Sequence, residues 1–249
     1  MKRVVLLFIL SFIIVFGSSI HNLTIFTEEY PPFNYQNSKT GSLEGIYVDI
    51  VDYILKDINS NLTRNDIQLV PWARGYRTTL GEKDTAIFAI TWTEERDPLF
   101  KWVGPVTPNK QVLIAKKDKN ITINSVADLK NYNIGVVRDD IAEQLLRGMG
   151  LTDQNIHQVH TPVLNARMID GGRIDMWAYG EGVARHILRT TLGSAENYET
   201  VYVLTESEMY IGFNPETSDE VIATFQKSLD KLKTQDKDIY NNILDKYLR

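Results

Sequence analysis

The fold of this chain is decided by the stretch Asp84-Thr-Ala-Ile-Phe-Ala-Ile-Thr-Trp-Thr-Glu-Glu-Arg96-Asp-Pro-Leu-Phe-Lys-Trp-Val-Gly104-Pro105. Residues 85–90 are apolar over the length of a strand and show no helical face. Polar residues follow, among them Thr91, Thr93 and Arg96. A buried strand that delivers hydroxyl groups and a guanidinium at its carboxyl end is typical of a ligand crevice in an open α/β sheet. A plain strand-to-helix turn explains these residues equally well, with Thr93 as a helix cap and Arg96 paired to a neighbouring carboxylate.

The composition is that of an ordinary globular chain. Its 249 residues suffice for one large domain or two lobes, and 43% are hydrophobic while 24% are charged. The net charge is −5, and an acidic chain is poorly suited to bind nucleic acid, so we expect no nucleic-acid partner. The chain has no cysteine, which excludes disulfides, thiolate nucleophiles and cysteine zinc sites.

The N-terminal residues have the pattern of an export signal. Lys2 and Arg3 precede an apolar run over residues 4–16, and Gly17-Ser18-Ser19 supplies small residues suited to cleavage. The run is short for a membrane span, which needs about 20 apolar residues. We therefore expect residues 1–19 to be a signal peptide and the mature protein to be exported, periplasmic or extracellular, and soluble. An uncleaved N-terminal anchor is the alternative.

Beyond the leader, short apolar segments alternate with amphipathic ones. The pattern predicts strands over residues 23–27, 67–70, 85–90, 111–115, 133–137, 200–204 and 209–213. It predicts helices between many of these strands and a turn-rich connector over residues 106–109. This alternation implies parallel-rich sheets that helices cover on both faces. The spacing from Gly81 to Asp84 recurs from Gly172 to Asp175, which indicates two lobes built on the same helix–strand unit.

Two aromatic segments follow predicted strands and are candidates for the wall of a ligand site. Tyr30-Pro31-Pro32-Phe33 must be a rigid loop, because its prolines forbid helix and ladder pairing. Its aromatic residues either face a ligand or form a small satellite core. Trp72 and Arg74 could together build a stacking and cation–π wall. Alternatively Trp72 packs in the core and Arg74 is solvated on a helix, as we expect of Arg77.

An ordered set of motifs resembles the solute-binding proteins of polar amino acid ABC importers, over essentially all of the chain after the leader. The motifs are Tyr30-Pro31-Pro32-Phe33, Gly45-Ile46-x-Val48-Asp49-Ile50, Gly81-x-x-Asp84, Thr93-Glu94-Glu95-Arg96 and Gly172-Arg173-Ile174-Asp175. The resemblance implies an α/β, two-lobed type II periplasmic-binding-protein fold with mixed, mostly parallel sheets flanked by helices. Two hinge crossings would lie near residues 105–110 and 205–209. Lobe 1 would comprise residues 22–107 and 207–249, and lobe 2 residues 108–206.

The resemblance also implies roles for residues of the first lobe. Arg96 would hold the α-carboxylate of a ligand through its planar fork of donors. Thr91 would supply a hydroxyl group, and the backbone near Ala89 would accept a hydrogen bond from the α-amino group. Tyr30 and Trp72 would sandwich the ligand's side chain.

The second lobe departs from the family pattern. Where the family has Ser or Thr at a helix start, this chain has Arg138-Asp139-Asp140, whose carboxylates either cap the helix or oppose a ligand carboxylate that its N–H groups would bind. The acidic residue that receives the α-ammonium group falls on Gly180, and Glu181 could replace it only if the strand end were shifted. We expect Arg138, Asp140 and Glu181 in this half of the site.

A binding protein is the predicted function. The sequence shows no nucleophile–base pair, and His157-x-x-His160 has no carboxylate at ligand spacing, so we expect no catalytic residue, metal or cofactor. The expected protein is a monomer that captures a small carboxylate-bearing solute, an amino acid or related compound, and docks transiently on an ABC permease. One alternative is a ligand sensor for a membrane receptor. Another is an enzyme similar to cyclohexadienyl or arogenate dehydratases, in which Glu181 would be a buried acid with a raised pKa.

Overall fold

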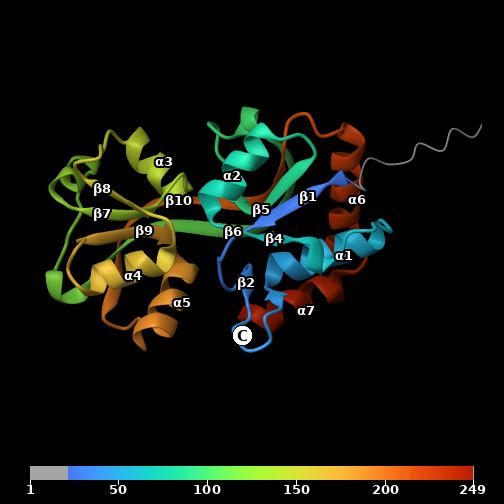
Figure 1. Cartoon of the computed structure of the whole chain (residues 1–249). Helices are drawn as coiled ribbons and strands as arrows, with labels where there is room; N and C mark the ends of the chain where they lie inside the picture. Colours follow the sequence, from blue (N-terminus) through green and yellow to red (C-terminus); the bar gives the residue numbers. More distant parts are fainter. Residues whose placement is uncertain (1–21, 249) are drawn as a thin grey trace, which may run out of the picture.

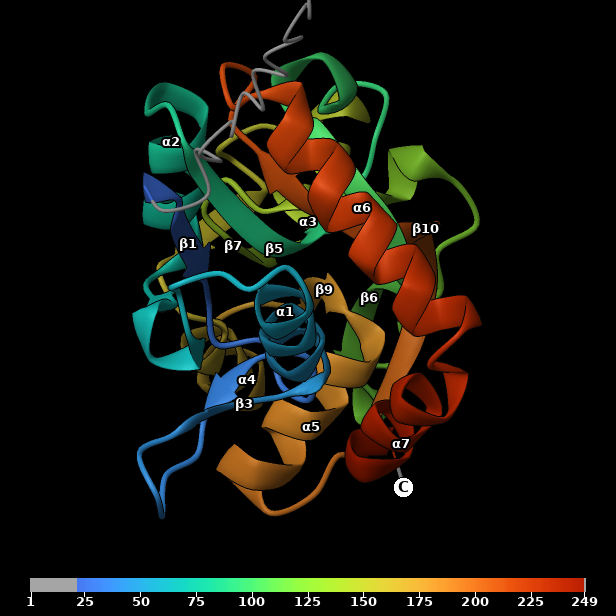
Figure 2. The ribbon, with the colours of Figure 1, turned by 90° about the vertical axis from the view of Figure 1, so that its right-hand side faces the viewer.

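The computed structural model describes residues 22–248 and shows a two-lobed α/β protein (Figures 1 and 2). Eight strands form one mixed sheet in the order β4-β1-β5-β10-β6-β9-β7-β8. In Figure 1, helices α1, α2, α6 and α7 surround the strands of one lobe, and α3, α4 and α5 surround those of the other. The predicted fold class is confirmed, and the predicted signal peptide lies outside the described residues.

Lobe 1 is built around the strand that opens the sequence analysis. Strand β1 pairs in parallel with β4 and β5, and β5 is buried along its whole length, which explains its continuous apolar run. The elements are β1 (Thr24–Thr27), β2 (Tyr35–Gln36), β3 (Leu43–Glu44), α1 (Ile46–Asp57), η2 (Arg64–Asp66), β4 (Gln68–Leu69), α2 (Trp72–Gly81), β5 (Thr85–Thr91), η3 (Asp97–Leu99), α6 (Asp219–Thr234) and α7 (Lys237–Leu248).

Lobe 2 repeats the same kind of unit on a smaller scale. Strand β7 pairs in parallel with β8 and β9. The elements are η4 (Lys117–Lys119), η5 (Val126–Asn131), β7 (Ile134–Val137), α3 (Ile141–Gly148), β8 (Ile156–Val159), α4 (Pro162–Asp170), β9 (Met176–Gly180) and α5 (Glu181–Leu192). The two matching glycine-to-aspartate spacings join α2 to β5 and α4 to β9, so each lobe contains the predicted helix–strand unit.

Two long strands connect the lobes where the two crossings were predicted, but the secondary structure expected there is wrong. β6 (Lys101–Lys116) replaces the expected connector, and β10 (Tyr198–Phe213) replaces two expected short strands. They pair antiparallel along their length, with irregular register at several points. One of these lies where β10 passes from Met209 to Ile211, opposite Pro105, and a bulge tolerates proline because it leaves a backbone amide unpaired. The predicted lobe boundaries fall within β6 and β10 and remain a prediction.

The larger of two hydrophobic cores runs through both lobes. It fills lobe 1, where α1 and α6 each contribute one buried face, and it continues into lobe 2 beneath α4 and α5. The smaller core lies between β7, β9, α3 and the lobe 2 half of β6. Among residues 22–248, no helix is long and apolar enough to cross a membrane.

Gly45 lets the proline-rich loop pack against the start of α1. Its φ of 128° favours glycine, and a Cβ there would lie 2.3 Å from the carbonyl oxygen of Phe33. The amides of Ile46 and Tyr47 donate to the carbonyl oxygens of Pro32 (3.1 Å) and Phe33 (2.8 Å). These bonds satisfy amides in the first turn of α1, which have no partner within the helix.

We expect Gly45→Ala to lower the free energy of unfolding by about 2 kcal/mol or more, because it adds both backbone strain and a clash. Urea denaturation of the two proteins measures the difference. The matched control is Gly182→Ala in α5, where no atom lies within 4 Å of the added Cβ, so the change should be neutral or stabilise by up to about 1 kcal/mol. Equal stability of Gly45→Ala and the parent protein would contradict this account of the loop.

Candidate ligand-binding site

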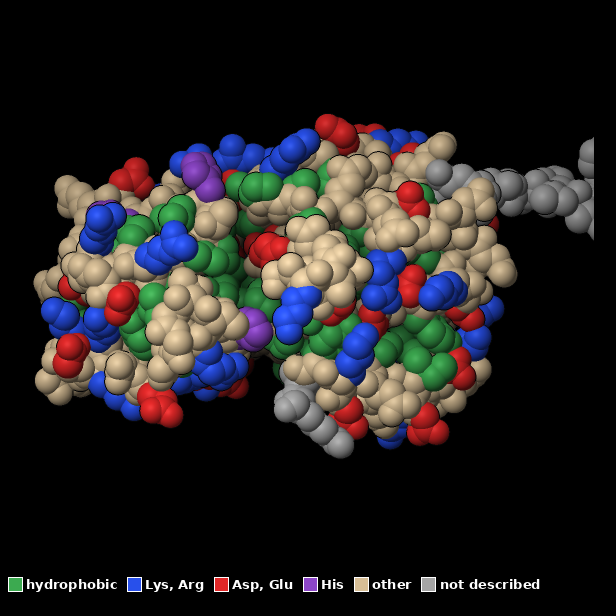
Figure 3. Space-filling view, turned by 60° about the horizontal axis from the view of Figure 1, so that its bottom comes forward, with side chains coloured by type: hydrophobic (Ala, Val, Ile, Leu, Met, Phe, Trp, Pro, Cys, Tyr) green, Lys and Arg blue, Asp and Glu red, His purple; other side chains and the backbone are tan. Residues whose placement is uncertain are grey.

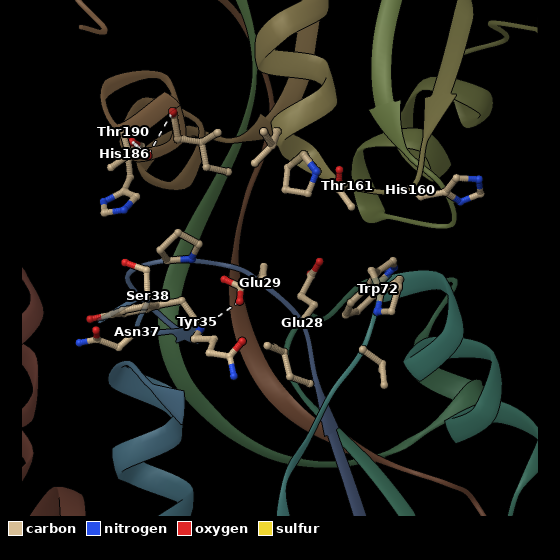
Figure 4. A pocket seen from close by; sticks show the side chains of 18 of the residues that line it. Glu28, Glu29, Tyr35, Asn37, Ser38, Trp72, His160, Thr161, His186 and Thr190 are labelled. Carbon is tan, nitrogen blue, oxygen red and sulfur yellow. Dashed lines mark hydrogen bonds between the residues drawn. The ribbon is translucent and has the colours of Figure 1, made fainter. Parts of the chain in front are cut away.

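A cavity of about 760 Å³ lies between the two lobes. Lobe 1 contributes the loop after β1 and the start of α2, and lobe 2 contributes the start of α4 and one face of α5 (Figure 4). The space-filling view shows the hollow between the lobes, with hydrophobic walls and an acidic side chain beside it (Figure 3). Its size is that of a site for a small molecule.

Arg96 lies behind this cavity, with its side chain held on all sides. It is 1% exposed, its Nε donates to Oε1 of Gln144 (2.9 Å), and its Nη1 donates to the carbonyl oxygen of Thr91 (3.1 Å). Its guanidinium carbon lies 5.6 Å and 5.2 Å from the ring centres of Trp72 and Tyr76. Its Nη2 is buried with no hydrogen-bond partner within residues 22–248. The structure thus brings three predicted site residues together, with one donor group unused.

The carboxyl end of β5 has an irregular backbone beside Arg96. Ala89 has a φ of 60°, and the pairing with β10 passes from Phe88 directly to Ile90, so Ala89 is the extra residue of a bulge. A left-handed alanine is strained and persists only where its surroundings enforce it, most often at functional sites. This irregularity lies at the position that was predicted to contribute backbone to the site.

The Tyr30 hydroxyl group fills the space next to Gly180, where the resemblance implies an acidic side chain. The Nδ2 of Asn109 in β6 donates to the hydroxyl groups of both Tyr30 and Thr91, each at 3.2 Å. A Cβ at Gly180 would lie 2.1 Å from the Tyr30 hydroxyl oxygen. The glycine is therefore required by the tyrosine, whose ring also contacts the edge of the Tyr179 ring at 5.3 Å between centres.

Two buried carboxyl groups accompany Arg96, and the sequence analysis identified only one of them. Glu28 and Asp140 are 6% and 5% exposed. Burial, together with the charge of Asp140, raises the pKa of Glu28 well above its ordinary value, although Arg96 opposes this. Burial also raises the pKa of Asp140 to about 6, although Arg96 and the amides of Ile141 and Ala142 act to lower it. The signal for Glu28 was its position immediately after β1, where a strand end faces the crevice.

Asp139 carries contacts between the lobes. Its carbonyl oxygen accepts a hydrogen bond from Nε1 of Trp72 (2.9 Å), and its carboxylate lies 2.6 Å from Nε of Arg77. Arg77 was expected at the surface, and its side chain is 65% exposed, yet it forms this ion pair with the other lobe. Gln144, which accepts from Arg96, also donates to the Asp139 carbonyl oxygen (3.2 Å). These contacts join the two lobes beside Arg96.

Two predicted site residues lie away from the cavity. Arg74 is exposed on α2, because it follows Trp72 by two residues and therefore points to the opposite side of the helix. Arg138 lines a separate hollow of lobe 2 beside β8. Its backbone amide donates to the carbonyl oxygen of Val159 (3.0 Å) and so continues the pairing of β7 with β8.

Glu181, the first residue of α5, also lies outside the cavity. It accepts a hydrogen bond from Thr200 (2.6 Å) and lies 3.7 Å from Nζ of Lys110. Burial alone would raise its pKa, but Thr200, Lys110 and Arg185 together lower it. A dehydratase acid needs the opposite shift, so Glu181 does not fit that role. Among residues 22–248, no group of His, Asp and Glu is placed to hold a metal ion.

Solved structures of similar fold cover almost the whole chain. A histidine kinase sensor domain with similarity to periplasmic binding proteins has a TM-score of 0.78 and 19% identity, covering 93% of this chain and 98% of its own. An ancestral arginine-binding protein bound to arginine has a TM-score of 0.75 and 20% identity, covering 92% and 100%. An ABC uptake transporter substrate-binding protein from Streptococcus pneumoniae with bound histidine has a TM-score of 0.77 and 16% identity, covering 90% and 91%.

These likenesses confirm the type II periplasmic-binding-protein fold. A comparison with curated protein sequences gave no match. The family model of bacterial extracellular solute-binding proteins, family 3, matches residues 23–249. Because that match spans nearly the whole sequence, the chain belongs to the family 3 bacterial extracellular solute-binding proteins.

Proposed function

We propose that this protein captures a small carboxylate-bearing solute between its lobes and delivers it to an ABC importer. The observation that carries the proposal is the cavity between the lobes, backed by a buried arginine with an unused donor group. Opening the lobes would separate Arg96 from Gln144 and expose a planar fork of donors, which suits a carboxylate. The solute would be an amino acid or a related compound.

In this proposal the lobes, residues 22–107 with 207–249 and residues 108–206, move about the two connecting strands. A solute favours the closed form only to the extent that it binds that form more tightly than the open one. The contacts of Asp139 with Trp72 and Arg77 belong to the closed form, because they join the two lobes. The protein would act as an exported monomer, after loss of the signal peptide over residues 1–19, and dock transiently on its permease.

We expect Arg96→Ala to abolish binding of the solute, and Arg96→Lys to weaken it at least tenfold, because lysine keeps the charge but loses the planar fork. Calorimetry with a solute found by thermal-shift screening of amino acids, dicarboxylates and polyamines measures the affinity. Circular dichroism checks that both variants fold. Unchanged affinity in the folded Arg96→Ala variant would remove this residue from the site.

The contact between Arg77 and Asp139 predicts that Arg77→Ala favours the open form. We expect a larger radius of gyration of the ligand-free protein in small-angle scattering, and a weaker affinity for the solute, because closure then forms one contact fewer. The control is Arg74→Ala, which removes the same charge from the same helix without touching lobe 2. If the two variants scatter identically, the ion pair has no influence on closure.

A second candidate function is suggested by the buried acids. The dehydratase reading fails for Glu181, but Glu28 and Asp140 both have raised pKa values beside the cavity, as a general acid needs. Incubation with prephenate or arogenate and chromatography of the aromatic products tests it. We expect no product above the uncatalysed rate. Product that disappears in Glu28→Gln or Asp140→Asn would instead establish an enzyme.

The sensor domain of similar fold supports a third possibility, a binding protein that reports its solute to a membrane receptor. Both roles require the same closure upon solute binding. They differ only in the membrane protein that recognises the closed form, which copurification with membrane fractions in the presence of the solute would reveal.

A further inference from the structure

We propose that the solute carries a second cationic group in its side chain, besides any α-ammonium group, and that this side-chain cation lies between the carboxylates of Glu28 and Asp140 and exchanges with a proton there. This inference rests on the proposed function and defines the chemical class of its ligand. The cationic group would belong to the part of the solute that lies away from its carboxylate. The observation behind the inference is the unequal number of buried acidic and basic side chains around Arg96.

The buried charges around Arg96 are unequal. Two acidic side chains, Glu28 and Asp140, share one guanidinium, and all three are at most 6% exposed. The Arg96 hydrogen bonds go to neutral acceptors, the side-chain oxygen of Gln144 and the backbone of Thr91. Within the described residues neither acid forms an ion pair with a basic side chain. A buried charge without a partner is costly, so with both acids ionised one negative charge requires a cation from outside the chain.

The cavity itself presents acid groups to an entering solute. Figure 4 shows the Glu28 side chain directed across the cavity towards lobe 2, and Glu29 lies in the same wall. Glu29 accepts a hydrogen bond from the backbone amide of Gln36 (3.0 Å), whereas the Glu28 carboxyl group has no hydrogen-bond partner within residues 22–248. Lys39 is the single Lys or Arg among the described residues of the lining, and it is exposed. Glu28 is thus the acceptor that remains available.

Aromatic rings near Glu28 also favour a cation in the cavity. Trp72 lines the cavity, and Tyr30 and Tyr179 lie close enough to Glu28 for its charge to raise the pKa of both hydroxyl groups, after the larger effect of burial. The Tyr179 hydroxyl is buried with no hydrogen-bond partner among the described residues. Aromatic faces attract cations, and most strongly where water is excluded. Carboxylates and rings therefore favour the same sign of charge in the solute.

Protons compete with such a cation for the same acceptors. The charges facing the pair are Arg96 and Glu29 beside Glu28, and Arg96 and Glu143 beside Asp140. The titratable side chains of Tyr30 and Tyr179 interact with both acids, and His160 and His186 line the cavity from lobe 2. At low pH the acids are protonated and offer the cation no charge; as pH rises through their pKa values they ionise, and the cation binds more tightly. Because the pKa of Asp140 is about 6, affinity should increase from pH 5.5 to pH 7.5 and protons should be released on binding.

The test uses matched solutes in calorimetry. L-arginine and L-citrulline have nearly the same shape but differ in charge, and agmatine has the guanidinium of arginine without its carboxylate. We expect arginine to bind at least tenfold more tightly than citrulline at pH 7.5. Arginine affinity should fall at least threefold at pH 5.5, with proton release detected as a dependence of the heat on the buffer.

Variants assign the effect to the acids. Glu28→Gln should bring the arginine affinity down to that of citrulline and leave citrulline unchanged, and Asp140→Asn should lower the arginine affinity and reduce proton release. Glu82→Gln removes the same charge from an exposed position outside the cavity, and should change the arginine affinity less than twofold. Thermal melting verifies that each variant is folded.

The outcomes separate this inference from the proposed function. Binding of neutral or acidic amino acids in preference to arginine, with loss in Arg96→Ala, would overturn the cation and leave the solute-binding function standing. Agmatine binding more tightly than arginine would support the cation and contradict the role of Arg96 in holding a carboxylate. Failure of every solute in the wider screen would overturn both.

Discussion

The burial of the Arg96 guanidinium is the constraint on which the rest of the site depends. A charge withdrawn from water needs acceptors and compensating charge, and this one finds both only where the lobes meet. Its acceptors are Thr91 of its own lobe and Gln144 of the other, and its charge is opposed by Glu28 and Asp140, one from each lobe. The contact between the lobes therefore depends on electrostatic interactions as well as on packing, and a solute bound there, as we propose, would have to fit this balance of charges.

The two connecting strands make that assembly possible. Because β6 and β10 are continuous and paired along their length, the lobes are joined by hydrogen-bonded backbone in place of loose connectors. The same strand β6 places Asn109 between Tyr30 and Thr91, so the connection and the site share residues. Movement of the lobes would then change the geometry of the site directly.

The fold class and some residues of the proposed site could be predicted from sequence, because local patterns indicate them. The apolar run of β5 and the polar residues after it identified Thr91 and Arg96, and the prolines identified the loop of Tyr30. The lobe 2 half of the site could not be predicted in this way. Whether Glu181 or Arg138 reaches the cavity depends on which face a residue presents after a strand ends, and a shift of one residue reverses that face.

By itself the sequence indicated a candidate site with an arginine and aromatic rings after predicted strands, because these patterns are local. Only the tertiary structure decided which acidic side chains lie beside Arg96. It buried Glu28 and Asp140 beside Arg96 and placed the Tyr30 hydroxyl against Gly180, where a family carboxylate was expected. These contacts join residues far apart in the chain, and burial, which shifts the pKa of each acid, exists only once the lobes are folded together.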